Sequence, residues 1–245
     1  MAQRVMPTNY LSDVIRPLFF VGNKEKNLGE IQRNFQLLFK TVFLFACPLF
    51  VAFLLLSREV IVVIFNGEFI DYYLILIAVA CSNFLNTFSV PVGLVAQLKE
   101  KADIIFYSKI FAVYNLLADI ALIPFLGIWG AVLATGTALL GKNLYIWFHV
   151  RDAAPFSGMS EFFIKMFVYW SFVAYLWLFA RQFIGGDTLR LGFGIIYIAM
   201  GCYFQLRTIS FSQWEWDLLH SLSAGNKKVG ILLKWSGLLH NNNRK

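Results

Sequence analysis

Four lysines lie inside or close to apolar stretches of the sequence: Lys40, Lys109, Lys142 and Lys165. An ammonium group is costly to bury in hydrocarbon, so each one indicates either a wet cavity or a path to a polar boundary. If Lys40, Lys109 and Lys142 face one cavity, they form a cationic vestibule that attracts an anionic group such as a pyrophosphate. The alternative is snorkelling, in which each ammonium group reaches the lipid head groups. Snorkelling is the stronger interpretation for Lys165.

A stripe of amide and hydroxyl groups marks the apolar stretch 72–96. Spacings of four, three, four and four residues place its members on one helical face. Pro91 has no amide hydrogen, so it should free the carbonyl of Thr87 and bend the helix. The stripe predicts either a water-filled cavity or polar contacts that hold neighbouring helices together. Its members are Ser82, Asn86, Ser89, Gly93 and Gln97, with Asn83 and Thr87 beside them.

The next stretches combine a second polar stripe with a row of small residues. In 104–124, Asn115 and Asp119 continue a stripe that begins at Lys101. Asp119 is the one acid well inside a stretch, and there it suits a proton or sodium site. The alternative is that it hydrogen-bonds a neighbouring helix or reaches the outer interface. In 127–149, small residues at four-residue spacing favour close helix packing: Gly130, Ala134 and Ala138.

The motifs of soluble enzymes are absent from the sequence. It contains no HExxH, GxSxG or Walker A run, and no GxGxxG that opens a helix. Glu59, Glu68 and Asp71 are expected in a loop at the interface and not as a catalytic pair. The three cysteines lie in apolar stretches without a CxxC spacing. We therefore expect no enzymatic activity, no disulfide framework, no metal site and no cofactor.

Composition predicts the elements that must position these groups. The 245-residue chain is 59% hydrophobic and 14% charged, against roughly 45–50% and about 25% in ordinary globular chains. These values exclude a soluble enzyme, a disordered tail and a fibrous protein, and they predict a polytopic membrane protein. A membrane-spanning helix needs about 20 mostly apolar residues. An all-α bundle of six spans is expected over residues 35–206, with helices at 36–57, 72–96, 104–124, 127–149, 162–182 and 189–206.

The distribution of positive charge predicts the orientation. Most lysines and arginines fall on one side of the predicted membrane, whereas Arg58, Arg181 and Arg190 fall on the other. Both termini should therefore be cytoplasmic. The net charge of +7 is not gathered in one patch, which argues against a nucleic-acid partner. Tryptophans and leucines at helical spacing in the basic tail 207–245 predict amphipathic helices on the inner leaflet, or alternatively a solvated tail.

Three segments resemble motifs of the multidrug/oligosaccharidyl-lipid/polysaccharide (MOP) transporter superfamily. Ile64–Phe69 is similar to its LFG-x-x-F/Y turn, and Pro91–Lys99 to its G-x-x-x-A-x-G-K/R helix end, with Leu98 in place of the second glycine. The most specific likeness is a helical hairpin with an I-P-x-x-G-I/V-x-G-A core, formed here by Asn115–Pro124 and Gly127–Ala131. Together these segments, within residues 1–150, resemble the polysaccharide flippase (Wzx-type) branch.

The resemblance implies one lobe of a two-lobed transporter that works by alternating access. On this basis residues 1–34 hold the remnant of a preceding helix and a cytoplasmic loop, and an N-terminal lobe or a second chain completes the cavity. The implied function is translocation of a polyprenyl-pyrophosphate-linked oligosaccharide across the bacterial inner membrane. The expected partners are this lipid-linked cargo, the membrane lipids and the missing lobe. The implied residue roles are attraction of the pyrophosphate by Lys40, Lys109 and Lys142, binding of sugar hydroxyls or an ion by Asn83, Asn86 and Asn115, and binding of a coupling ion by Asp119.

Three other functions stay open at this point. A small-molecule exporter of the same superfamily would prefer an acidic or aromatic cavity. An integral-membrane glycosyltransferase or polysaccharide polymerase would need a sizeable polar loop, whereas the longest loops expected here, around 57–71 and 150–161, are short. The chain would otherwise be inert and serve only as a packing partner.

Overall fold

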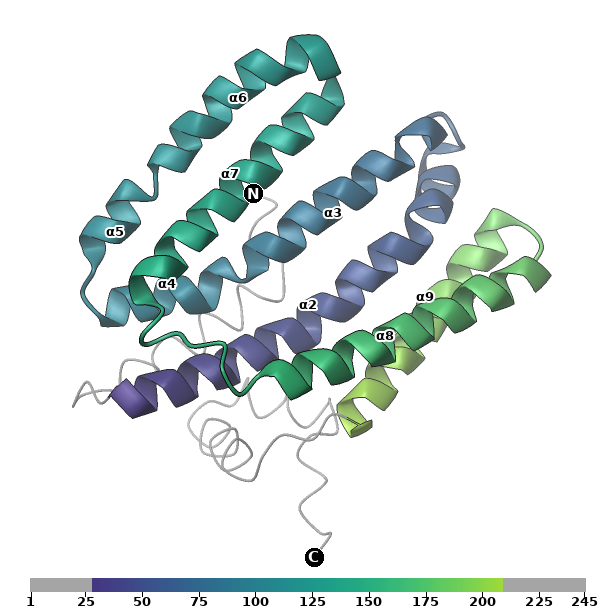
Figure 1. The fold of residues 1–245 in the computed structure, drawn as a ribbon. Coiled ribbons are helices and arrows are strands. Elements are labelled where there is room, and N and C mark those ends of the chain that lie inside the picture. Colours follow the sequence, from purple (N-terminus) through teal and green to yellow (C-terminus); the bar gives the residue numbers. More distant parts are fainter. Residues whose placement is uncertain (1–27, 209–245) are drawn as a thin grey trace, which may run out of the picture.

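The computed structural model describes residues 28–208, which are helical except for short connections (Figure 1). The predicted all-α fold is therefore confirmed. The 3-10 turns η2 (Ile70–Tyr72) and η3 (Arg181–Phe183) precede α3 and follow α8. The predicted helix remnant and most of its loop, at 1–27, and the predicted tail from 209 onward lie outside the described residues. The helices are α2 (Leu28–Phe65), α3 (Tyr73–Thr87), α4 (Ser89–Leu98), α5 (Ala102–Tyr107), α6 (Ile110–Leu126), α7 (Ile128–Val150), α8 (Ser160–Ala180) and α9 (Asp187–Thr208).

Each of the six predicted spans coincides with a helix or with two helices in line. In chain order they fall in α2, α3 with α4, α5 with α6, α7, α8 and α9. Five of these are long and apolar enough to cross a membrane by length and composition. The span α7 is not among the five, since Lys142, Asn143 and its glycines lower its mean hydropathy.

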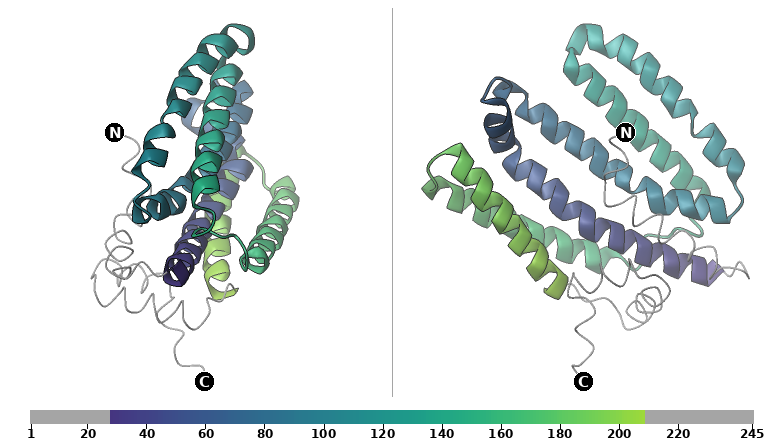
Figure 2. Two further views of the ribbon diagram at one scale, coloured as in Figure 1. Left: turned by 60° about the vertical axis from the view of Figure 1, so that its left-hand side comes forward. Right: turned by 180° about the vertical axis from the view of Figure 1, so that it is seen from behind.

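The helices stand side by side in a row (Figures 1 and 2). From one edge inward, α6 packs mainly against α7, α7 against α3 and α4, and α3 against α2. On its other side α2 contacts α8 and α9. The order in space differs from the order in the chain because α7 returns between α6 and α3. No residue of α6 is buried within the described part of the chain.

The long helix α2 is central because it is apolar on two faces. Phe35, Leu38 and Phe39 pack with residues of α4, α5, α7 and the loop after α7 in one buried cluster. Further along, Leu44, Val51 and other residues of α2 pack with α8 and α9 in a second cluster. A helix with apolar side chains on both sides is suited to this buried position.

The predicted proline bend lies where α3 passes into α4. The helix is interrupted at Phe88, three residues before Pro91. The Phe88 ring stacks on Phe39 of α2 with 5.0 Å between ring centroids. Next to the interruption, Asn143 of α7 donates its Nδ2–H to the carbonyl of Leu85 at 3.1 Å. An amide from a neighbouring helix thus serves a backbone oxygen at the break, where water is scarce in a membrane.

The α6–α7 hairpin depends on small residues at its turn and along α7. Gly127 has a φ of +56°, which an L side chain rarely adopts, and it reverses the chain between the helices. A Cβ at Gly130 would lie 2.6 Å from the carbonyl carbon of Leu122, so only glycine fits there. Ala134 and Ala138 are buried in the same row. The predicted packing role of this row is confirmed.

A proline and a glutamine join the middle of α2 to the α8–α9 hairpin. Pro48 has no N–H, so the carbonyl of Leu44 loses its donor four residues later. Gln205 of α9, which is 1% exposed, donates its Nε2–H to this carbonyl at 3.0 Å. Its Oε1 accepts the indole N–H of Trp170 of α8 at 2.7 Å. One amide therefore satisfies polar groups on two other helices.

Replacing this glutamine should cost stability in a manner that depends on Pro48. Gln205→Leu leaves the Leu44 carbonyl and the Trp170 N–H unpaired, and each such group costs about 1–3 kcal/mol. In a Pro48→Ala background the new amide at 48 restores a helical donor, so the cost of Gln205→Leu should be smaller. The measurement is the free energy of unfolding by denaturant in detergent for the four variants of the cycle. Equal costs in the two backgrounds would show that the Leu44 carbonyl does not need the glutamine.

Candidate functional site

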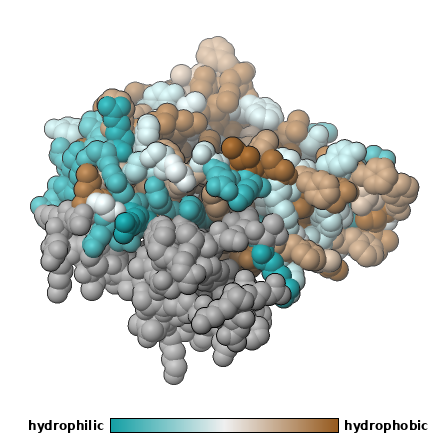
Figure 3. All heavy atoms as spheres, turned by 60° about the horizontal axis from the view of Figure 1, so that its bottom comes forward, coloured by the Kyte–Doolittle hydropathy of each residue, from teal (hydrophilic) through white to brown (hydrophobic). Residues whose placement is uncertain are grey.

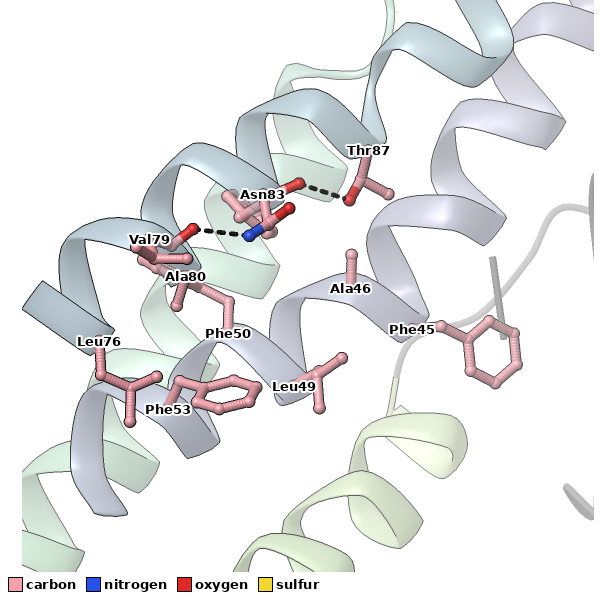
Figure 4. Close-up of a pocket in the computed structure, with 11 residues that line it drawn as sticks. Phe45, Ala46, Leu49, Phe50, Phe53, Leu76, Val79, Ala80, Asn83 and Thr87 are labelled. Atoms are coloured by element: carbon pink, nitrogen blue, oxygen red, sulfur yellow. Dashed lines mark hydrogen bonds between the residues drawn. The ribbon is translucent and has the colours of Figure 1, made fainter. Parts of the chain in front are cut away.

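An apolar groove of about 130 Å³ lies between α2 and α3 (Figure 4). Its walls carry no charged side chain, and its only polar side chains are those of Asn83 and Thr87. A cavity of about 150 Å³ with an apolar lining stays dry and holds a molecule such as benzene. The groove therefore suits a short length of hydrocarbon. It is lined by Phe45, Ala46, Leu49, Phe50 and Phe53 of α2, and by Leu76, Val79, Ala80, Asn83, Phe84 and Thr87 of α3.

The two polar side chains lie one helical turn apart on α3, on the side of the groove nearer to α4. Asn83 donates its Nδ2–H to the carbonyl of Val79 at 2.9 Å, and the Thr87 hydroxyl donates to the carbonyl of Asn83 at 2.9 Å (Figure 4). These bonds hold both side chains against their own helix. Both side chains line the groove, so this end offers modest polar contact beside an apolar wall.

The other predicted amides and the acid do not line this groove. Asn86 is half-buried on α3, and its Oδ1 is buried with no hydrogen-bond partner among the described residues. Asn115 and Asp119 lie one turn apart on α6, and each has one such unpartnered oxygen. Because α6 packs mainly against α7, these two residues belong to a different interface from Asn83. Their predicted roles in sugar or ion binding stay predictions.

The lysines are likewise distributed over different elements. The Lys40 ammonium lies 5.9 Å from the centre of the Phe162 ring of α8, and that of Lys109 lies 5.8 Å from the Phe106 ring of α5. Lys142 is half-buried on α7. None of these lysines lines the groove. The predicted cationic vestibule is thus not part of the groove, and its role stays a prediction.

Lys165 forms an ion pair with Glu161, with 2.6 Å between Nζ and Oε1. Both side chains are largely exposed, at 63% and 79%. This contact lies along one helix, four residues apart, and offers little enclosure for a ligand. The interpretation of Lys165 as a residue that reaches the interface agrees with this exposure.

A buried ion pair that the sequence did not predict joins α2 to the end of α8. Glu59 lies inside α2 and not in the expected loop, and its side chain is 1% exposed. One of its oxygens lies 2.9 Å from Nη2 of Arg181 in η3. Neither oxygen accepts a well-aligned hydrogen bond within the described chain. The contact is therefore one of charge proximity, with the second carboxylate oxygen left unpaired.

Charged and polar groups join the connections at the opposite end of the helices. Lys99, after α4, forms an ion pair with Asp152, after α7. Lys101 donates to the carbonyl of His149 at 2.6 Å, and Gln32 donates to the carbonyl of Asp152 at 2.7 Å. Hydrophilic side chains gather on the left of Figure 3, where these helix ends lie, and hydrophobic ones cover the right. The row thus has a polar end and apolar flanks.

Sequence reasoning missed three polar residues that the structure places at helix contacts: Asn143, Gln205 and Glu59. Pro48 was a usable signal, because a proline within a span frees a carbonyl that needs a donor. The identity of the donor depended on which helix lies beside Leu44, and no spacing within the chain indicates that α9 does so.

By the length and hydropathy of its helices, the chain is a multi-pass membrane protein. Within the described residues, no group of three or more histidine, cysteine or acidic side chains is arranged to hold a metal ion. Comparison with protein-family models, with curated proteins and with solved structures gives no match.

The Lys99–Asp152 pair should make stability depend on pH. The hydrogen bond from Lys99 lowers the pKa of Asp152 below its usual value of 3.8. The pair therefore stabilises the fold above that value, and its contribution is lost as the pH falls through the lowered pKa. Because Asp152 is 55% exposed, we expect no more than about 0.2–1 kcal/mol.

Lys99→Met should thus lower the unfolding free energy near about pH 6. The loss should be smaller near about pH 2, because Asp152 takes up a proton as the pH falls through its lowered pKa. Asp152→Asn is the matched variant and should remove the same pH-dependent part. A loss in Lys99→Met that is equal at both pH values would assign it to packing of the lysine stem instead of to its charge.

Proposed function

We propose that this chain is one lobe of a MOP-type flippase that moves a polyprenyl-pyrophosphate-linked oligosaccharide across the bacterial inner membrane. The observation that carries the proposal is the groove between α2 and α3. It combines a hydrocarbon-lined wall with an amide and a hydroxyl near one end, at Asn83 and Thr87. A lipid-linked sugar has the same two parts, a hydrocarbon chain and a polar head.

The distribution of charge supports the orientation that this function needs. Lys99, Lys101 and Arg151 lie at the helix ends nearer to the polar side of the groove. By the positive-inside rule this end faces the cytoplasm. The head group of a lipid bound in the groove would then point toward the side on which such cargo is assembled.

The open row of helices supports the idea of a lobe. The outer edge of the row is apolar and uncovered, as at Phe125, which is 86% exposed. Lipid, or a second set of helices, covers such a surface in a membrane. In the proposed mechanism a second lobe packs against this row, and the two rock about the cargo. Lys40, Lys109 and Lys142 attract the pyrophosphate as it enters.

A second candidate is a small-molecule exporter of the same type. The volume of the groove and its phenylalanine walls favour it, since about 130 Å³ matches a small aromatic molecule better than a long isoprenoid chain. The two candidates differ in how the occupant continues beyond the groove. A polyprenyl chain extends out into the bilayer, whereas a drug-sized molecule stays within it.

Filling the groove should weaken lipid binding. The probe is a radiolabelled polyprenyl pyrophosphate with a photoreactive diazirine in its chain, added to the purified protein in nanodiscs. In the wild type we expect labelled peptides from α2 and α3. Ala80→Trp places an indole in the groove and should raise the apparent Kd at least about tenfold, or 1.4 kcal/mol.

The matched control is Leu117→Trp, on the exposed face of α6, which should leave the Kd unchanged. Equal loss in both variants, or labelling of α2 and α3 that Ala80→Trp does not reduce, would remove the groove as a lipid site. Competition by cationic dyes but not by polyprenyl pyrophosphate would favour the exporter.

Translocation should depend on Lys142 more than on Lys165. Lys142 is half-buried within α7, so Lys142→Ala removes a charge that the enclosed anion would meet, and a tenfold slower rate corresponds to 1.36 kcal/mol. Lys165 is exposed and paired with Glu161, and Lys165→Ala should leave the rate unchanged. The measurement is the appearance of lipid-linked oligosaccharide in the outer leaflet of cells that carry each variant at equal protein level. Equal rates in the two variants would refute the role of Lys142.

A further inference from the structure

We propose that Glu59 is a proton-binding site that controls the contact between α2 and the connected end of the α8–α9 hairpin. When Glu59 is ionised, Arg181 is held against α2. When Glu59 takes up a proton, Arg181 is released to water and this end of the hairpin separates from α2. The proposal does not depend on the cargo, because it concerns only the protein's own helix contacts.

The first support is the depth at which Glu59 lies. The residue is 0% exposed and sits on the face of α2 that carries Leu55 and Leu56. One turn earlier, α9 approaches so closely that a Cβ at Gly194 would lie 2.4 Å from Cδ2 of Leu56 and 2.9 Å from Cζ2 of Trp177. Glu59 therefore follows directly on a tightly packed layer, from which water is excluded.

The second support is the incomplete pairing of the carboxylate. Arg181 lies 2.9 Å from one oxygen, and the other oxygen has no hydrogen-bond partner within residues 28–208. The buried indole N–H of Trp177, one turn before Arg181, also has no acceptor there. A buried charge with a single partner is balanced only while that partner stays in place. Protonation removes the charge and with it the reason for Arg181 to stay.

The third support is a path to water on the far side of Arg181. The Arg181 side chain is 24% exposed and lines an open pocket of about 410 Å³ with Leu178, Gln182 and Arg190. In the proposed release, Arg181 keeps its charge and turns outward into this pocket. The pocket thus gives the released arginine a place in contact with water.

The other charged groups near this end are paired with each other or exposed. Arg190 of α9 donates its Nε–H to the carbonyl of Ile184 at 2.9 Å and lies 3.6 Å from Asp187. Arg58 of α2 is exposed. Asp187 is thus the second acid whose titration must be separated from that of Glu59.

The location of a second polar tie explains why the opening is confined to one end. Gln205 holds the other part of the hairpin to the Leu44 carbonyl, and this amide does not titrate. Figure 1 shows the α8–α9 connection at the opposite end of the hairpin from the last turn of α9. When the Arg181 contact is lost, the connected end of the α8–α9 hairpin should therefore move away from α2, while the end at Gln205 stays in place.

The test measures the distance between two spin labels by pulsed electron–electron double resonance. The labels are attached to cysteines introduced at Leu54 of α2 and Phe183 of η3, both of which are exposed. The full chain is used in nanodiscs, with its three cysteines replaced by alanine. On lowering the pH from about 8 to about 4.5, a range in which a carboxylate can titrate, we expect a longer or broader distance. Glu59→Gln should show the low-pH distribution at both pH values, whereas Asp187→Asn should respond as the wild type does.

Arg181→Gln keeps the proposal falsifiable if Glu59→Gln does not fold. It should give the low-pH distance distribution at both pH values, because the Glu59–Arg181 ion pair then lacks its arginine. A wild-type distance that does not change with pH overturns the proposal, as does a normal pH response in Glu59→Gln or Arg181→Gln. A response that disappears in Asp187→Asn also overturns it, since the proton would then bind on α9.

Discussion

Pro48 removes a backbone donor inside a membrane-spanning helix, and the hydrogen bond from Gln205 to the Leu44 carbonyl compensates for it. In hydrocarbon no water is present to take this place, so leaving the carbonyl unpaired would be costly. The same amide accepts the Trp170 N–H, so α2, α8 and α9 are joined at one point. Asn143 acts in a similar way at the interruption near Phe88, where it joins α7 to α3. The helices of the row are thus held together where the backbone is irregular.

These polar ties explain why the molecule can be a row and still have defined contacts. In a membrane, apolar burial adds little to helix association, so close packing and hydrogen bonds select the neighbours. Gly130 permits the close approach of α6 and α7, and Gly194 that of α9 and α2. The groove lies between α2 and α3. Bulky phenylalanines line it, and the proposed cargo would occupy space that the protein's own side chains leave free.

Much of the fold could be predicted from the sequence because membrane helices follow hydropathy, proline and glycine directly. The six spans, the break before Pro91, the α6–α7 turn at Gly127 and the small-residue row of α7 all depend on local composition. Of the candidate site, the sequence indicated Asn83 as a polar residue within a span, and the structure places it at the groove. The contacts of the lysines could not be predicted in this way. A lysine side chain is long, so what it contacts depends on which helix lies beside it, as Phe162 of α8 lies beside Lys40.

By itself, then, the sequence determined that the chain is helical, in which stretches its spans lie, and which end of the row carries the positive charge. Only the tertiary structure decided that α7 returns between α6 and α3, that Gln205 meets Leu44, and that Glu59 is buried against Arg181. The physical reason is that helix formation depends on residues close in the chain, whereas these contacts join residues of different helices, which can lie as far apart as 205 and 44. Spacing within one helix shows which face is polar, and packing alone decides what that face meets.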